Sequence, residues 1–166
     1  MRAALSAVLI DNFDRDKARR QREQNQKLFE ENSRYSERIR FTLGPHAIYT
    51  VSEESLRWCA DFAGENGLQI HLHLSETQKE VADCVQQHGL RPVEYLDQLG
   101  VLGPNLVAVH AIWMTDEEID LLVKNEVKIA HSPTSNMKLC SGKFPYSSFK
   151  EQAACIAIGT DGCSSN

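Results

Sequence analysis

Six short apolar segments, separated by stretches with helix signals, limit what this chain can fold into. The segments are residues 3–10, 39–43, 68–74, 106–110, 127–131 and 154–160. Between them, Ser52, Thr77 and Thr115 are each followed by acids, as at helix N-termini, and Gly67 and Gly89 suit helix C-termini. Strands joined by helical crossovers pair in parallel, and parallel sheets are covered on both faces or closed into barrels. The sequence therefore predicts an α/β fold.

The last apolar segment favours a closed barrel over an open sheet. In "CIAIGTD" the small residues Cys155, Ala157 and Gly159 alternate with Ile156 and Ile158. Small residues inward and branched residues outward suit a crowded barrel interior surrounded by helices. A complete (β/α)₈ barrel needs eight strands and about 250 residues. A chain of 166 residues with these six segments is therefore predicted to form a partial barrel that lacks about two units.

Composition excludes several other classes of protein. The net charge of −5 argues against nucleic acid as a main partner. No apolar stretch approaches the roughly 20 residues of a membrane span, and the charged stretch after residues 3–10 argues for a strand there rather than a signal peptide. The five cysteines form no C-x-x-C pair, so we expect a cytoplasmic protein whose cysteines fill small core spaces. Cys163, next to a turn, is the one expected to be accessible.

Polar side chains stand at the ends of successive predicted strands. "IHLHLSET" carries one of them, and the full set is His46, His73, His110, His131 and Asp161. The carboxyl ends of barrel strands form the active-site rim, and histidine with carboxylate suits an ion such as zinc. An "HLH" alone is more often a hydrogen-bonded pair of strand residues, but the recurrence favours a metal-dependent hydrolase. No G-x-S-x-G elbow, phosphate loop or H-E-x-x-H helix competes with this interpretation.

Five motifs resemble those of a known family. "TLGPHAIYT", "HLHLSET", "VAVHAIWMTDEEI", "HSPTSNMKL" and "IGTDGCSSN" are similar, in this order, to motifs of the amidohydrolase superfamily. The nearest resemblance is to the branch that deaminates 5′-methylthioadenosine and S-adenosylhomocysteine, with the chlorotriazine hydrolases as relatives. The resemblance implies that residues 1–166 form a single incomplete barrel domain, about strands 3 to 8 of a (β/α)₈ TIM barrel. The first two βα units and the family's small β-domain would be absent.

The same resemblance implies a site. The family holds one divalent metal, zinc or iron, with two histidines of a first-strand H-x-H, a fifth-strand histidine and an eighth-strand aspartate. By motif, His73 and Asp161 correspond to the last two ligands. Glu76 corresponds to the acid/base that serves the substrate ring, and His110 to the residue that holds the attacking water with Asp161. His46 corresponds to a histidine that contacts the purine.

Other residues receive secondary interpretations. His71 is expected to be a packed or hydrogen-bonded residue of the barrel interior, and His131 a structural or rim residue rather than a ligand. Asn136 is expected to brace the loop after the seventh barrel strand. Three arginines could meet the carboxylate of S-adenosylhomocysteine or could simply form a solvated helix face: Arg19, Arg20 and Arg22.

The sequence also departs from the family pattern, because nothing in it corresponds to the first-strand H-x-H. With His73 and Asp161 alone, metal binding is expected to be weak or absent. The open barrel edges are expected to favour self-association or a homo-oligomer. The predicted function of the parent enzyme is hydrolytic deamination of the adenine ring of a purine nucleoside, with little activity in the isolated chain. The alternatives are deamination of guanine or 8-oxoguanine, chlorotriazine hydrolysis, or a non-catalytic fragment.

Overall fold

The computed structural model describes residues 2–35 and 37–165. Residues 1 and 166, the bounds of the predicted domain, therefore lie outside the described residues. The strands are β1 (Ala3–Leu5), β2 (Val8–Leu9), β3 (Ile39–Phe41), β4 (Gly44–Pro45), β5 (Ile70–Leu74), β6 (Leu106–His110), β7 (Lys128–His131) and β8 (Ile156–Ile158). The helices are α1 (Arg15–Glu31), α2 (Glu53–Asn66), α3 (Gln78–His88), α4 (Pro92–Gln98), α5 (Asp116–Lys124), α6 (Pro133–Lys138) and α7 (Tyr146–Glu151), with a 3-10 turn at Asn32–Arg34.

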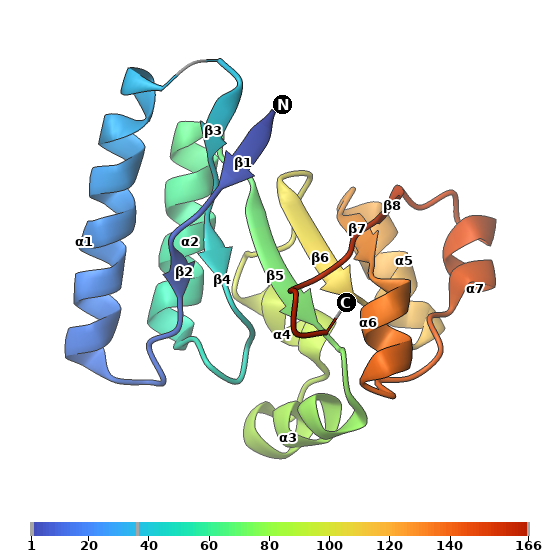
Figure 1. The fold of residues 1–166 in the computed structure, drawn as a ribbon. Coiled ribbons are helices and arrows are strands. Elements are labelled where there is room, and N and C mark those ends of the chain that lie inside the picture. Colours follow the sequence, from blue (N-terminus) through green and yellow to red (C-terminus); the bar gives the residue numbers. More distant parts are fainter. Residues whose placement is uncertain (1, 36, 166) are drawn as a thin grey trace.

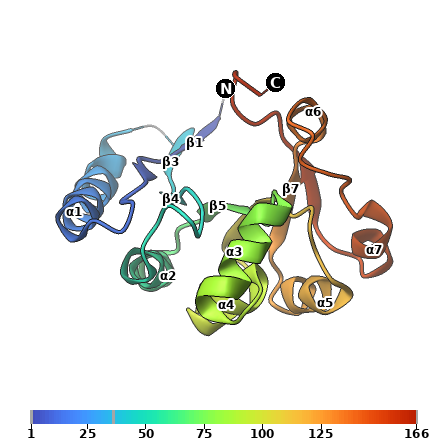
Figure 2. The ribbon, with the colours of Figure 1, turned by 90° about the horizontal axis from the view of Figure 1, so that it is seen from below.

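The strands pair in parallel and follow one another around an arc (Figure 1). Strands β5, β6, β7 and β8 form one sheet in that order, β1 pairs with β3, and β2 pairs with β4. Bridges from Leu43 to Ile70 and from Ala47 to His73 join the β3–β4 segment to β5. Figure 2 shows α1, α2, α3, α4, α5 and α7 on the outer side of this arc, whereas α6 lies on the other side, near the C-terminus. The prediction of a partial barrel is confirmed.

Two open edges bound the arc, and the first is less regular than the sequence predicts. Residues 3–10 form two short strands rather than one buried strand, and Leu5 and Val8 are more than half exposed. The break occurs where Ser6 lies over Gly44, so closely that a Cβ on Gly44 would be 2.5 Å from Ser6 Oγ. At the other edge Ile158 is 81% exposed. Exposed parallel edges favour pairing with another strand, so self-association stays a prediction.

Helix ends follow the expected chemistry. Ser52, Thr77 and Thr115 each accept a hydrogen bond from a backbone N–H in the first turn of the following helix. Gly67 and Gly89 end α2 and α3 in the left-handed conformation, which glycine adopts without steric cost. These caps define where α2, α3 and α5 begin and where α2 and α3 end. The helical connections bring the strand ends to one rim.

The core lies between the sheet and its outer helices. On β5, Ile70, Leu72 and Leu74 are fully buried, whereas the alternate residues His71 and His73 are half-buried on the inner face. Helices supply further fully buried side chains, among them Leu56, Leu96, Ile119, Leu122 and Phe149. The alternation on β5 confirms that apolar residues face the helices and histidines face the barrel interior.

Two expectations about the C-terminal half are wrong. The "TSNMKL" stretch is not a loop, because helix α6 occupies most of it, with Pro133 in its first turn. Cys59 and Cys84 are buried as expected, but Cys140, Cys155 and Cys163 are exposed. The core interpretation fails for Cys140 and Cys155, because α6 ends before Cys140 and β8 lies at an open edge. Cys163 is exposed, as expected for a residue next to a turn. In the described part of the chain, no helix is long and apolar enough to cross a membrane.

Candidate metal centre

Three predicted site residues meet at the rim formed by the carboxyl ends of the strands. His73 is the second-to-last residue of β5, His110 is the last residue of β6, and Asp161 follows β8. One ligand atom from each of the three lies within 4.8 Å of the others. His73 Nε2 is 3.9 Å from Asp161 Oδ1, and His110 Nε2 is 3.8 Å from Asp161 Oδ2. The structure thus brings together residues that are 88 positions apart in the sequence.

Hydrogen bonds on the opposite ring nitrogens fix the two histidines. His73 Nδ1 lies 2.9 Å from the carbonyl oxygen of His46, and His110 Nδ1 lies 2.8 Å from Oδ1 of Asn136. Each Nδ1–H therefore donates, which leaves the Nε2 lone pair directed into the site. His110 Nε2 is buried and has no partner among the described residues. A buried acceptor without a donor is the feature expected of a nitrogen that awaits a cation.

Asp161 supplies the negative charge. Burial opposes ionisation, but hydrogen bonds from Ser135 Oγ, the Gly162 amide and Ser165 Oγ outweigh it and lower the pKa of Asp161 below its ordinary value. Its backbone is left-handed, with φ of 62°, a conformation that aspartate tolerates better than most residues. The carboxylate is therefore ionised at neutral pH and held in place.

The three groups suit a divalent metal such as zinc. Tetrahedral coordination at about 2.0–2.2 Å places ligand atoms roughly 3.3–3.5 Å apart, and catalytic zinc sites have three protein ligands. The 3.8–3.9 Å separations between histidine and aspartate atoms need only a small contraction. The expected ligands His73 and Asp161 thus lie together with His110, which the resemblance implies as a water-holding residue, and the role of each in metal binding stays a prediction.

His110 reaches the site by a route that strand alternation does not predict. Leu106, Ala108 and His110 share one face of β6, and that face is the helix-covered one, because Leu74 is the register partner of His110. Alternation along β6 would therefore direct His110 away from the site. His110 has a φ of 74° and Ala111 one of 48°, so the chain turns sharply there. The turn brings the imidazole to the rim.

Glu76 lies beside the three groups. Its Oε2 is 3.8 Å from His110 Nε2, and its Oε1 accepts a hydrogen bond from Ser141 Oγ at 3.1 Å. Its backbone N–H donates to Oε2 of Glu80, and the Ser75 N–H donates to Oε1 of Glu80. Glu76 is thus held by hydrogen bonds at both its backbone N–H and its carboxylate.

Glu80 is the residue that sequence reasoning missed. The "TQKE" stretch fits a capping box at the start of α3, and the carboxylate of Glu80 also accepts from the amides of Ser75 and Glu76, which precede the helix. Glu80 is only 4% exposed. Burial raises its pKa to about 7, although the Ser75 and Glu76 amides oppose the rise. The signal available in sequence was a glutamate four residues after an expected catalytic acid.

His46 lies next to His73, with ring centroids 5.0 Å apart. Its Nδ1 is 2.8 Å from Thr50 Oγ1, which donates to the Ala47 carbonyl, so Nδ1–H of His46 donates to the hydroxyl. Burial and the neighbouring His73 lower the pKa of His46. Its Nε2 is therefore free for a neutral hydrogen bond, and its contact with the purine stays a prediction.

The secondary expectations are mostly consistent with the structure. His131 stacks on Phe144 with ring centroids 4.2 Å apart, as a structural residue would. His71 lies half-buried in the interior, and burial lowers its pKa. Asn136 does brace its surroundings, through His110, but from a helix rather than a loop.

The arginines of helix α1 bind acidic side chains. Arg22 donates to Glu54 at 2.7 Å, and Arg19 pairs with acids of its own helix. Neither pair includes a residue of the rim. The structure thus favours the solvated helix face for Arg19, which is 59% exposed, whereas Arg22 is 17% exposed and also donates to Ser55 of α2.

Comparison with known proteins places the chain in a family. The amidohydrolase family pattern matches residues 1–166. The chain is 43% identical to 5′-deoxyadenosine deaminase of Methanothermobacter thermautotrophicus and 41% identical to 5-methylthioadenosine/S-adenosylhomocysteine deaminase 1 of Archaeoglobus fulgidus, in each case over 100% of the chain. It spans about two fifths of each relative's length, 39% in both cases.

Solved structures agree with this assignment. An adenosine deaminase from Xanthomonas campestris with bound zinc superposes with a TM-score of 0.91 at 36% identity, over 100% of this chain and 38% of that one. The atrazine chlorohydrolase of Arthrobacter aurescens, complexed with zinc, has a TM-score of 0.90 at 18% identity, over 100% and 39% of the two chains. The second likeness shows the fold alone. By sequence pattern and by fold, the chain belongs to the amidohydrolase family.

Proposed function

We propose that the whole protein containing this chain catalyses metal-dependent hydrolytic deamination of the adenine ring of a nucleoside. One observation carries the proposal: Glu76, His110 and Asp161 converge, with Oε2 of Glu76 and Oδ2 of Asp161 each 3.8 Å from His110 Nε2. A proton donor for a ring nitrogen and acceptors for a proton from water are the groups that this reaction needs. The sequence relatives, named as deaminases of adenine nucleosides, support the same reaction.

A divalent ion held by His73, His110 and Asp161 would lower the pKa of a coordinated water towards neutrality. The chain's own residues would supply the remaining steps. Asp161, ionised and fixed by hydrogen bonds, accepts a proton from the attacking water. Glu76 delivers a proton to the ring nitrogen next to the carbon under attack, so negative charge does not accumulate on the purine. Asp161 then passes the proton taken from water to the amino group, the carbon–nitrogen bond breaks and ammonia leaves. The hydroxyl now on that carbon returns a proton to Glu76 and becomes the carbonyl of the product. His46, neutral and adjacent to His73, orients the ring through Nε2.

The substrate we propose is an adenine nucleoside without a 5′-hydroxyl, with 5′-methylthioadenosine preferred over S-adenosylhomocysteine. The names of the relatives cover 5′-deoxyadenosine, 5′-methylthioadenosine and S-adenosylhomocysteine, which share the adenine, the ribose and a modified 5′ carbon. S-adenosylhomocysteine also needs a cation for its carboxylate, and two of the three candidate arginines, Arg19 and Arg22, are engaged with acids. Arg20 is the remaining candidate. Only similarity of fold supports guanine or a chlorotriazine as the substrate.

The test is turnover by the zinc-loaded whole protein, followed by the ultraviolet change as adenine becomes hypoxanthine. We expect chelator-sensitive deamination of 5′-methylthioadenosine and 5′-deoxyadenosine, and none of guanine or a chlorotriazine. Turnover of guanine alone, or no turnover of any adenine nucleoside, would refute the proposal. The same assay on the 166-residue chain tests the expectation that the isolated chain has little activity.

Glu76→Gln separates catalysis from metal binding. We expect turnover to fall by about 10²- to 10⁴-fold, the contribution of a general acid/base, while the zinc content stays the same. The matched control is Glu65→Gln on the exposed surface of α2, which should change neither quantity. Loss of zinc in Glu76→Gln would show that Glu76 is a ligand or a structural residue instead.

A further inference from the structure

The loops that follow β5, β6 and α6 are hydrogen-bonded to one another. The carbonyl of Ser75 accepts from the amides of Ile112 at 3.2 Å and Trp113 at 3.0 Å. The indole Nε1–H of Trp113 donates to the carbonyl of Ser141 at 2.7 Å. Three segments that are distant in sequence therefore form one connected unit at the rim.

Ser141 is the member of this unit that touches Glu76. The residue is 7% exposed, its amide donates to the Asn136 carbonyl at 3.0 Å, and its hydroxyl donates to Oε1 of Glu76 at 3.1 Å. The other oxygen, Oε2, lies 3.8 Å from His110 Nε2. The two oxygens of one carboxylate thus have different surroundings. Oε1 is held by the hydroxyl, and Oε2 faces the metal ligands.

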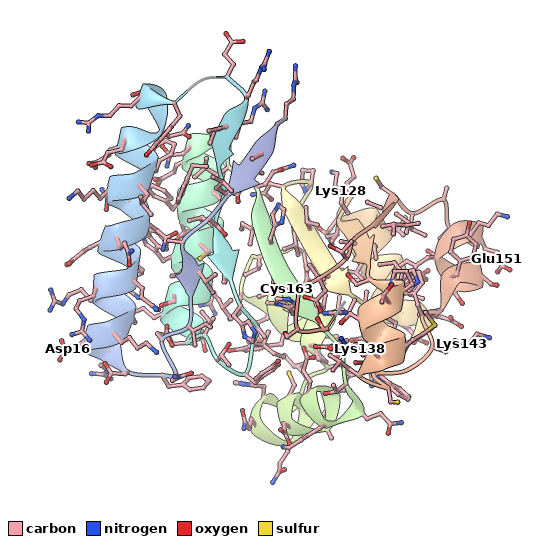
Figure 3. All side chains as sticks on the ribbon, in the orientation of Figure 1. Asp16, Lys128, Lys138, Lys143, Glu151 and Cys163 are labelled. Atoms are coloured by element: carbon pink, nitrogen blue, oxygen red, sulfur yellow. The ribbon has the colours of Figure 1, made fainter. Side chains whose placement is uncertain are left out.

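Gly142 fixes where the Ser141 hydroxyl lies. Its φ is 136°, and a Cβ there would be 2.8 Å from Ile112 Cγ2 and 2.9 Å from Trp113 Cζ2. Only glycine lets the backbone pass this close to the indole. Lys143, the next residue, is labelled in Figure 3 on the loop between α6 and α7. The close approach on one side and the indole hydrogen bond on the other leave Ser141 little freedom.

We propose that Ser141 is a positioning residue, whose hydroxyl holds Oε1 of Glu76 so that Oε2 is the oxygen that transfers the proton. The proposal rests on the proposed function, in which Glu76 serves the substrate ring. The terminal torsion of a glutamate is broad and roughly two-fold. Without the hydroxyl, the carboxyl group rotates and presents either oxygen at varying angles. Proton transfer depends on such alignment, because small misplacements of a reacting group lower the rate strongly.

Kinetics of the zinc-loaded whole protein test this role. Ser141→Ala should lower kcat by about 10- to 100-fold, with KM and zinc content unchanged, and Ser141→Thr should restore most of kcat because it keeps a hydroxyl. Gly142→Ala should lower kcat similarly although the hydroxyl remains. The control is Ser147→Ala on the exposed side of α7. An unchanged kcat in Ser141→Ala, or equal losses in the Ala and Thr variants, would overturn the proposal.

A second readout needs no turnover. The carboxyl ¹³C resonance of Glu76 in the 166-residue chain, assigned by its absence in Glu76→Gln, reports the surroundings of the two oxygens. We expect Ser141→Ala to shift or broaden this resonance and Ser141→Thr to preserve it. If the wild-type protein deaminates no substrate, the proposed function is refuted. The resonance of Glu76 still tests, independently of turnover, whether the Ser141 hydroxyl contacts Glu76. An identical resonance in Ser141→Ala would refute the contact.

Discussion

Replacement of Glu80 by glutamine should change how the stability of the fold depends on pH. The carboxylate of Glu80 is 4% exposed, and burial raises its pKa from an ordinary value near 4.5 to about 7. Each pKa unit corresponds to about 1.4 kcal/mol, so this rise in pKa corresponds to roughly 3 kcal/mol of folding free energy. The folded chain binds this proton more tightly than the unfolded chain. The stabilisation is therefore complete below about pH 4.5 and is lost as pH rises through about 7.

Urea unfolding of the 166-residue chain, followed by circular dichroism between pH 4.5 and 8, measures this effect. The free energy of unfolding of the wild type minus that of Glu80→Gln should fall by up to about 3 kcal/mol across the range. The Glu80→Gln variant lacks this titrating group. The other titrating groups are present in both proteins, so their contributions cancel in the difference between the two free energies of unfolding. Because the charge of Glu76 contributes to the raised pKa, the fall should be smaller in a Glu76→Gln background. A constant difference, or one that rises with pH, would refute the reasoning.

This titration bears on the site because Glu80 holds the amide of Glu76. Both oxygens of Glu80 accept from backbone N–H groups, at 2.8 Å from Ser75 and 2.9 Å from Glu76. A proton removes the negative charge, and a neutral carboxyl group is a weaker acceptor than a carboxylate. Protonation of Glu80 therefore weakens its hydrogen bonds to the turn that carries Glu76.

Further predictions concern stability and metal affinity. Gly64→Ala, in the exposed part of α2, should raise the free energy of unfolding by about 0.5–1 kcal/mol, measured in urea. Gly67→Ala should lower it by about 1–2 kcal/mol, because Gly67 has a φ of 63° although its surroundings are equally open. Phe149→Ala should lower it by about 3–5 kcal/mol, because Phe149 is fully buried. Asn136→Ala should weaken zinc binding about 10- to 100-fold in a chelator competition, because it removes the acceptor that orients His110.

Much of the fold could be predicted because each strand carries its own signal. The segment 106–110 is a strand with the predicted bounds, and β5 and β7 differ from theirs by one or two residues. These strands are flanked by capped helices, so apolar runs and turn chemistry agree. Residues 3–10 depart from the prediction because the edge of an open sheet lacks the neighbour that would keep one strand straight. Helix α6 escaped prediction because six residues with an exposed Met137 show no apolar periodicity.

The site could be predicted only in part. His73 and Asp161 follow from strand periodicity and from the resemblance together, since both stand where parallel strands end. Ser141 carries no sequence signal and Glu80 only its spacing from Glu76, because their contacts with Glu76 depend on how the chain folds locally at the rim. A serine after a short helix and a glutamate at a helix start have ordinary explanations. Only the distances in the structure reveal that both residues contact Glu76.

The backbone shows why periodicity failed at the rim in particular. Ser75, His110, Ala111 and Asp161 all have positive φ and none is glycine, a conformation that costs about 1 kcal/mol or more for each residue. All four lie directly after β5, at the end of β6 or after β8, where the ligand atoms meet. Hydrogen bonds such as that from the Ala111 amide to the Leu74 carbonyl, at 2.9 Å, offset the cost. A strand that continued its alternation would send His110 into the helices. These turns with positive φ therefore direct side chains from the ends of separate strands towards one point at the rim.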